Sequence, residues 1–129
     1  MEKENPMEKA MRLVMKYERE QHRHPKNVSG DRKKGYDIES DGRLIEVKSS
    51  KWEEPRNYQE ITANEKKILK KHPNKYYLYV VADIKNKTPI LKMFTGREIV
   101  GKKLIRPLNY KVRFINGIWD KIKSIKLKD

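Results

Sequence analysis

The chain has 129 residues, 39% of them Asp, Glu, Lys or Arg, and its 32 basic residues against 18 acidic ones give a formal net charge of +14. This length fits one domain, and the absence of cysteine excludes disulfides and thiolate metal sites. Because no apolar run is long enough for a membrane span and none follows a basic start, we expect a cytoplasmic protein with no membrane partner. The positive surplus favours polyanionic partners, nucleic acid first; a basic but otherwise ordinary soluble surface is the alternative.

The first predicted element is a helix that begins after Asn5, a suitable capping residue, with Pro6 at its first position and Glu8 in its first turn. One side of this helix is expected to be buried, because apolar residues recur there at helical spacing: Met7, Ala10, Met11, Val14 and Met15. Glu18 occupies the next position of that stripe, so it lies either at an exposed helix end or toward a polar pocket. The helix should stop before Pro25.

A polar loop is expected from Lys26 to Lys34, directly before the next strand. It ends in a basic run that would contact bound phosphates or else form a solvated loop: Arg32, Lys33 and Lys34. The spacing of His22 and His24 suits one face of a strand and not one face of a helix, and His72 precedes a proline at a helix end. We therefore expect no histidine metal site.

Residues 35–50 are predicted to form two short strands joined by a tight turn, because Asp41-Gly42 is a strong two-residue hairpin signal. With this loop Ser40 pairs with Arg43, and the same register sets Asp37 directly across from Glu46. Opposed residues share a face of the sheet, with Cβ atoms roughly 5 Å apart.

Alternation with a period of two gives this hairpin two distinct faces. Lys48 points the same way as Glu46, so two carboxylates and a lysine are expected in one small patch, on the face that also carries Leu44. The other face is expected to be apolar and to carry Tyr36, Ile38, Ile45 and Val47.

Opposed like charges destabilise a sheet unless something neutralises them. Magnesium is usually held by one or two carboxylates together with waters and substrate phosphate. Lys48 would then orient or help to deprotonate an attacking water, or balance charge at the phosphate, which outlines a hydrolytic site for phosphodiesters. The alternative is that Glu46 and Lys48 form a surface ion pair on an exposed hairpin, and the spacing alone leaves both interpretations open.

The stretch from Ser50 to Gln59 lacks clear periodicity, and its aromatic residues Trp52 and Tyr58 would either stack on bases or pack over the core. After it, Thr62-Ala63-Asn64-Glu65 is a capping box that begins a helix running to about Lys71. Capping accounts for Thr62 and Glu65 in structural terms. The helix carries lysines that either track a nucleic-acid backbone or form a solvated face: Lys66, Lys67, Lys70 and Lys71.

Tyr76 to Ala82 is continuously apolar, as expected for a central strand buried on both faces. Ile90 to Phe94 is expected to extend the sheet as an antiparallel edge, followed by a short turn or helix at Arg97 to Val100. Tyr110 to Ile115 should form one more strand, and Trp119 to Lys128 is either helix or strand. This order of elements predicts a mixed α/β sheet.

Three segments together resemble the No Vein C-terminal-like domain family within the PD-(D/E)xK phosphodiesterase superfamily: Gly35-Tyr36-Asp37-Ile38, Ile45-Glu46-Val47-Lys48 and Thr62-Ala63-Asn64-Glu65. The resemblance covers roughly Met7 to Ala82, and it departs in having Tyr36 where a proline often precedes the aspartate. It implies one domain over 1–129 with a restriction endonuclease-like fold. That fold has a mixed central β-sheet flanked by helices, an αβββαβ core in about 6–82 and a β-rich C-terminal extension in 83–129.

The same resemblance implies a metal-dependent endonuclease that uses Mg²⁺, with Mn²⁺ as a substitute, on DNA rather than RNA. Position by position, Asp37 and Glu46 match the metal-binding carboxylates, Lys48 the catalytic lysine and Val47 a position whose carbonyl often completes the metal shell. Glu18 is a fourth active-site candidate, because an acidic residue of the first helix often joins such sites, and Asn64 is expected near the substrate, beside Lys66 and Lys67. The alternative function is a non-catalytic, basic nucleic-acid-binding module, and the sequence does not decide whether the chain forms a homodimer.

Overall fold

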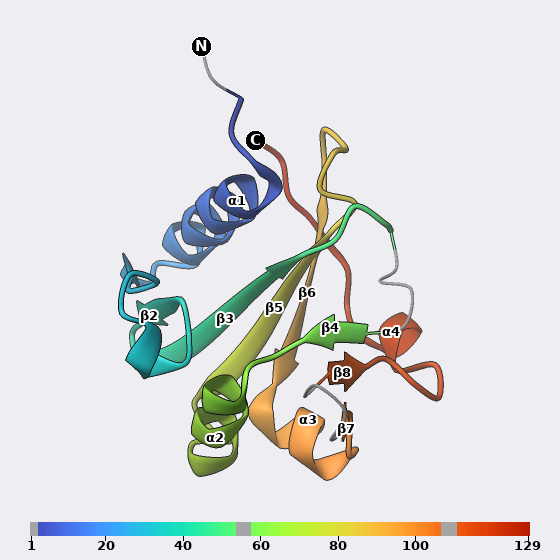
Figure 1. Ribbon diagram of the computed structural model, residues 1–129. Coiled ribbons are helices and arrows are strands. Elements are labelled where there is room, and N and C mark those ends of the chain that lie inside the picture. The colour runs from blue at the N-terminus through green and yellow to red at the C-terminus, as the bar shows by residue number, and fades with distance from the viewer. Residues whose placement is uncertain (1–2, 54–57, 107–110) are drawn as a thin grey trace.

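The computed structural model of the protein describes residues 3–53, 58–106 and 111–129 and has a mixed α/β fold (Figure 1). The helices are α1 (Pro6–Glu20), α2 (Ala63–Lys71), α3 (Gly96–Gly101) and α4 (Ile118–Lys121), with a 3-10 turn, η1 (Arg32–Lys34). The strands are β1 (Pro25–Asn27), β2 (Ile38–Ser40), β3 (Arg43–Ser49), β4 (Tyr58–Glu60), β5 (Tyr76–Ala82), β6 (Ile90–Thr95), β7 (Ile105–Arg106), β8 (Lys111–Arg113) and β9 (Ile125–Lys126). Measured by length and apolarity, no helix among the described residues qualifies as a membrane span.

The larger sheet has six strands in the order β1-β2-β3-β5-β6-β9, and the smaller sheet has three in the order β4-β8-β7. β3 and β5 run parallel, and every other pair is antiparallel. The parallel pair requires a crossover, which runs through β4 and α2. The predicted central strand Tyr76–Ala82 is confirmed with the same bounds, and only Tyr77 is not fully buried.

Two apolar clusters lie on opposite faces of the larger sheet. Helix α1 covers one face, while α2, α3, α4 and the smaller sheet lie on the other (Figure 1). Members of the first cluster include Ala10, Leu13, Val14, Ile38, Ile45, Val47 and Tyr79. Members of the second include Leu69, Tyr76, Leu78, Phe94, Ile99, Val112 and Trp119. Successive residues of β3 and β5 therefore contribute to different clusters, as alternation requires.

The start of α1 is confirmed, because Asn5 and Glu8 form a reciprocal capping box and Pro6 is the first helical residue. The predicted buried stripe is partly wrong. Met7 is 37% exposed, and Leu13, which the prediction left out, is buried. Ala10, Leu13 and Val14 occupy the middle of the face that packs on the sheet, and Met11 and Met15 are half-buried on its flank.

Other expectations need correction. The loop predicted at 26–34 contains β1 and η1, since Pro25–Asn27 pairs with β2. β6 is not an edge, because β9 returns along it, so the C-terminal segment contains both a helix and a strand. β8 falls within the predicted strand 110–115, but Tyr110 lies outside the described part of the chain. In the stretch from Ser50 to Gln59, residues 54–57 and the side chain of Tyr58 also lie outside it.

Candidate active site

The β2–β3 hairpin has the predicted register, with Ser40 opposite Arg43 and Ile38 opposite Ile45. Asp37 directly precedes β2, where the regular ladder ends, and its backbone N–H donates to the carbonyl of Ile45 at 2.8 Å. Its carboxylate Oδ2 accepts a 2.8 Å hydrogen bond from the N–H of Val47. The backbone of β3 therefore holds the Asp37 side chain against the middle of that strand, beside Glu46.

The end of the ladder at Ile38 also explains why the prediction for Tyr36 was wrong. Tyr36 packs with Leu44 against the cluster on the α2 side, and Ile38 is buried on the α1 side. Alternation no longer applies at Tyr36, because the residues before β2 are not in a strand. Its hydroxyl donates to Glu39 at 2.7 Å.

Glu46 is buried, with 4% of the residue exposed, which contradicts a surface ion pair on an exposed hairpin. Burial raises the pKa of Glu46 to about 9, the neighbouring carboxylates of Asp37 and Glu65 add to this effect, and Lys48 opposes it. Burial also raises the pKa of Asp37. Two carboxyl groups therefore share a site with too little compensating positive charge, which is the electrostatic environment that a bound cation relieves.

Lys48 lies between two of these acids. Its Nζ is 3.0 Å from Glu46 Oε2 and 3.3 Å from Glu65 Oε1, and its side chain is 20% exposed. Burial disfavours the charge on Lys48, but Glu46 and Glu65 outweigh burial and raise its pKa. The lysine is therefore an ammonium group near neutral pH, better suited to balancing negative charge than to accepting a proton.

Glu65 is a site residue that sequence reasoning missed. Its Oε1 accepts a 3.0 Å hydrogen bond from the N–H of Thr62, as the capping box predicted, and the same oxygen faces Lys48. The capping motif explained the residue completely, so its place in the family-like segment Thr62-Ala63-Asn64-Glu65 was not interpreted as a second role. Only the crossover from β3 to β5, which sets the start of α2 beside β3, brings Glu65 to the carboxylates.

The carboxylates of Asp37, Glu46 and Glu65 line a pocket of about 320 Å³, and Asp37 also lines a pocket of about 550 Å³ beside α1. Its lining combines the acids with the start of α2 and the loop before β2: Ser29, Asp31, Arg32, Gly35, Tyr36, Asp37, Glu46, Thr62 and Glu65. A small anionic group of a larger ligand that enters this pocket would meet Arg32 as well as the acids.

Asn64 connects this wall to α2. Its Nδ2 donates to the carbonyl oxygens of Arg32 at 3.1 Å and Lys33 at 2.9 Å, so the amide holds η1 and is not directed at a ligand. Gly35 follows η1 with a φ of 77°, and a Cβ added there would lie 2.8 Å from Ile68 Cγ1 in α2. The turn and α2 are thus closely packed, which fixes Arg32 at the pocket.

The structure does not bring every predicted residue to this site. Lys34 pairs with Glu39 at 3.0 Å, and Lys33 and Lys67 are exposed. Lys66 lies one residue beyond Glu65 and lines a different groove. The basic run before β2 therefore contributes only Arg32 to the described lining of the pocket, while Lys33 is exposed and Lys34 is paired with Glu39.

Glu18 lies on the opposite face of the sheet and does not join Asp37 and Glu46. It is fully buried, receives two hydrogen bonds from Arg23 at 2.6 and 2.7 Å and one from the Tyr79 hydroxyl at 2.9 Å. Burial disfavours its ionisation, but these hydrogen bonds outweigh burial and lower its pKa. Glu18 is therefore directed into polar surroundings, as one of the two alternatives predicted. Its charge there is neutralised by an ion pair with Arg23, between α1 and the sheet.

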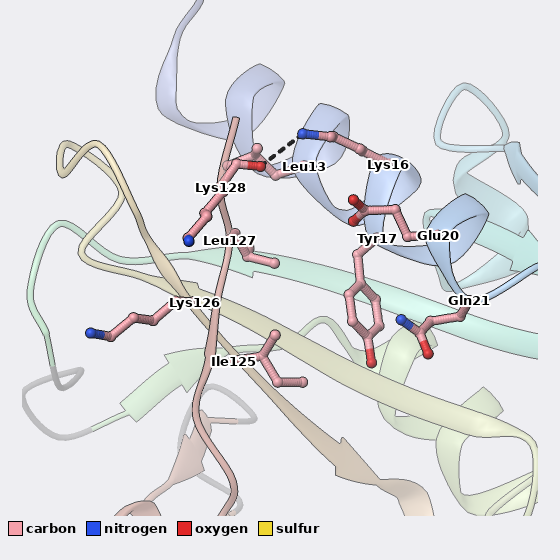
Figure 2. Close-up of a pocket in the computed structure, with 9 residues that line it drawn as sticks. All are labelled: Leu13, Lys16, Tyr17, Glu20, Gln21, Ile125, Lys126, Leu127 and Lys128. Carbon is pink, nitrogen blue, oxygen red and sulfur yellow. Dashed lines mark hydrogen bonds between the residues drawn. The ribbon is translucent and has the colours of Figure 1, made fainter.

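Another pocket lies between α1 and the C-terminal segment, away from the carboxylates. Figure 2 shows Tyr17 directed from the helix toward Ile125, while Lys126 extends away from the helix. Lys16 donates to the carbonyl of Lys128 at 2.8 Å, and Glu20 also lines the pocket. None of the residues predicted for a functional site lines it.

Within the described residues, no group of three or more His, Asp or Glu side chains is arranged to hold a metal ion. A cation at the carboxylate site would therefore have two side-chain ligands, Asp37 and Glu46, as the sequence predicted. A main-chain carbonyl such as that of Val47 and solvent or substrate oxygens would complete its shell, a composition that is common for Mg²⁺.

A family model described as "Protein NO VEIN, C-terminal" matches residues 7–94 of the chain. The match runs from the first turn of α1 into β6, so it includes Asp37, Glu46, Lys48 and Glu65. Neither the curated proteins nor the solved structures contain a significant match.

Proposed function

We propose that this chain, which belongs to the family of the NO VEIN C-terminal domain, is a metal-dependent nuclease of the PD-(D/E)xK type that hydrolyses phosphodiester bonds in DNA. The observation that carries the proposal is that the buried Glu46 lies 3.0 Å from Lys48 and lines an open pocket together with Asp37. Buried acids with raised pKa values are costly to a fold, and they are concentrated at functional sites.

The order of elements supports a restriction endonuclease-like fold for the proposed enzyme. A helix, α1, precedes three antiparallel strands, and a crossover with α2 leads to a strand parallel to β3. This is the αβββαβ order expected from the resemblance, with β4 added within the crossover. Glu46 lies on β3, a middle strand of the sheet, and Asp37 directly precedes β2, where the N–H of Val47 holds its carboxylate in place.

The residues fit a divalent cation of the Mg²⁺ class. Asp37 and Glu46 offer hard oxygen donors, and their shared burial leaves negative charge that Lys48 only partly compensates. When bound there, Mg²⁺ would supply Lewis-acid polarisation of the phosphodiester and a lowered pKa of a coordinated water. Mn²⁺ has the same preference for oxygen ligands and would substitute.

The chain's own residues have distinct roles in this proposal. The N–H of Val47 orients the Asp37 carboxylate through its 2.8 Å hydrogen bond. Lys48, held as an ammonium by Glu46 and Glu65, stabilises negative charge that develops on the phosphate or orients the attacking water. Arg32 at the pocket wall binds a phosphate oxygen of the substrate.

The test is cleavage of supercoiled plasmid and branched DNA with Mg²⁺, with Mn²⁺ and with a chelator. Cleavage by the unaltered chain should require the metal and should be lost in Lys48→Ala, Asp37→Ala and Asp37→Asn. The asparagine variant keeps an acceptor for the Val47 N–H, so loss of activity there is not loss of fold. Cleavage that survives in all three variants would refute the proposed site.

A second candidate is a non-catalytic nucleic-acid-binding module, which the net charge of +14 favours. It predicts binding to DNA that weakens steeply with salt and does not depend on Mg²⁺. Tight binding in a chelator, combined with no cleavage of any substrate in either metal, would favour this candidate over the nuclease.

A further inference from the structure

A groove outside the carboxylate site lies between α2 and the segment that joins α3 to β7. Lys66 and Lys70 line it from α2, and Lys103 and Arg106 line it from the other wall. Its remaining lining is apolar: Ile99, Val100 and Ile105. None of these described lining residues is acidic, so the groove combines four positively charged side chains with three apolar ones.

Three of the four basic side chains of this groove have no partner among the described residues. Within the described part of the chain, Lys70, Lys103 and Arg106 make no ion pair and no side-chain hydrogen bond, and all three are exposed. By contrast, Lys34 is paired with Glu39, and the pocket in Figure 2 includes Glu20 and a lysine bound to a main-chain carbonyl. The groove is therefore a site of uncompensated positive potential that attracts a polyanion.

Its position relates it to the carboxylate site. Glu65, whose side chain faces Lys48, is followed directly by Lys66, and Lys70 lies four residues further along α2. Four residues of helix span roughly 6 Å and place Lys66 and Lys70 on the same side of α2, so both can contact neighbouring phosphates of one strand. A strand that leaves the carboxylates along α2 would therefore place successive phosphates against Lys66 and Lys70, opposite Lys103 and Arg106.

We infer that this groove binds the phosphate backbone of the nucleic acid on one side of the bond to be cleaved. The inference rests on the proposed function for the location of that bond, and it adds a second contact surface from the C-terminal part of the chain. The enzyme would then need several nucleotides of substrate beyond the carboxylate site, because a shorter substrate cannot reach Lys103 and Arg106.

The test compares two double variants that remove the same charge. Lys70→Ala/Lys103→Ala removes one lysine from each wall of the groove, and Lys85→Ala/Lys87→Ala removes two exposed lysines from the β5–β6 turn, at the opposite end of the sheet (Figure 1). Lys103 has a φ of 52°, but alanine also carries a Cβ, so the substitution does not change the backbone preference.

Binding of a labelled DNA duplex is measured by fluorescence anisotropy in a chelator, over a series of salt concentrations. The groove variant should reduce the slope of log affinity against log salt by about 2, and should lose at least tenfold in affinity at about 0.1 M salt. The turn variant should change both quantities much less. Equal effects of the two variants, or no effect of the groove variant, would overturn the inference.

Cleavage distinguishes failure of this inference from failure of the proposed function. If the unaltered chain does not cleave DNA but the groove variant alone binds it weakly, the groove assignment holds and the nuclease proposal fails. If the chain cleaves DNA and the groove variant binds and cleaves as well as the turn variant, the nuclease proposal holds and the groove assignment fails. A substrate series shortened on either side of the cleaved bond should lose affinity in steps on one side only.

Discussion

Replacing Glu46 with glutamine should stabilise the metal-free fold while abolishing metal-dependent activity. The residue is 4% exposed, and burial raises its pKa to about 9 from an ordinary value of 4.5. The amide has the same shape but no charge to desolvate. A site that binds a cation is therefore expected to cost the unbound protein stability, and the substitution removes that cost.

The sign and size of the effect follow from proton linkage. The folded chain binds the Glu46 proton more tightly than the unfolded chain, so the contribution of Glu46 to stability is greatest below about pH 4.5 and falls as the pH rises toward 9. At about 1.4 kcal/mol for each pH unit above the ordinary pKa, the cost at pH 7 is about 3 kcal/mol. Lys48 loses a partner at 3.0 Å, which offsets part of the gain, and a net stabilisation of about 1–2 kcal/mol is expected.

The measurement is urea unfolding in a chelator at pH 5, 7 and 9, followed by circular dichroism. Glu46→Gln should exceed the unaltered chain in free energy of unfolding at pH 7, and the difference should grow toward pH 9. The melting temperature at pH 7 should rise by about 3–8 °C. Millimolar Mg²⁺ should stabilise the unaltered chain and leave the variant unchanged, because only the former binds it.

Glu39→Gln is the matched control. The Glu39 side chain is 37% exposed, and the Tyr36 hydroxyl and Lys34 lower its pKa, so its substitution should give no stabilisation at any of these pH values. A Glu46→Gln variant that is less stable than the unaltered chain at pH 7, or a difference that does not depend on pH, would refute the reasoning about burial of this acid.

Three further predictions concern the surroundings of the site. Glu18→Gln should destabilise the fold by about 2 kcal/mol at pH 7 because it leaves Arg23 without its partner, while DNA cleavage should persist. Urea unfolding should show this loss of stability shrinking as the pH falls, since the lowered pKa of Glu18 stabilises the fold only above its protonation range. Gly35→Ala should cost about 1–3 kcal/mol in thermal unfolding, since its φ is 77° and a Cβ would contact α2, and an unchanged melting temperature would contradict the packing of η1. Glu65→Gln should keep an acceptor for the helix cap but remove a charge near Lys48. We expect at least a tenfold loss of kcat in single-turnover assays with less than about 1 kcal/mol of destabilisation, and full activity would exclude a role of Glu65 in catalysis.

Local patterns predicted the parts of the fold that depend on neighbouring residues. The Asp41-Gly42 turn set the hairpin register, and that register predicted that Asp37 and Glu46 would meet. The capping motif at Thr62 predicted where α2 begins, and the apolar run at 76–82 predicted the central strand. Each of these signals acts over a few residues, so no long-range information was needed.

The errors arise where contacts between distant segments decide the outcome. Periodicity placed Glu18 on a buried stripe, but only the fold shows that Arg23 and Tyr79 satisfy it on the far face of the sheet. Periodicity also assumed that the strand extends to Tyr36, whereas the strand begins at Ile38. Glu65 was predicted as a cap, and its approach to the site depends on how the β3–β5 crossover packs.

A single oxygen, Glu65 Oε1, both caps α2 and faces Lys48. Fraying of the first turn of that helix would leave Lys48 paired with Glu46 alone while the sheet beneath it remains folded, so the proposed activity should weaken before the molecule melts. If the chain is the proposed nuclease, its inactivation on heating should therefore precede the loss of β-structure.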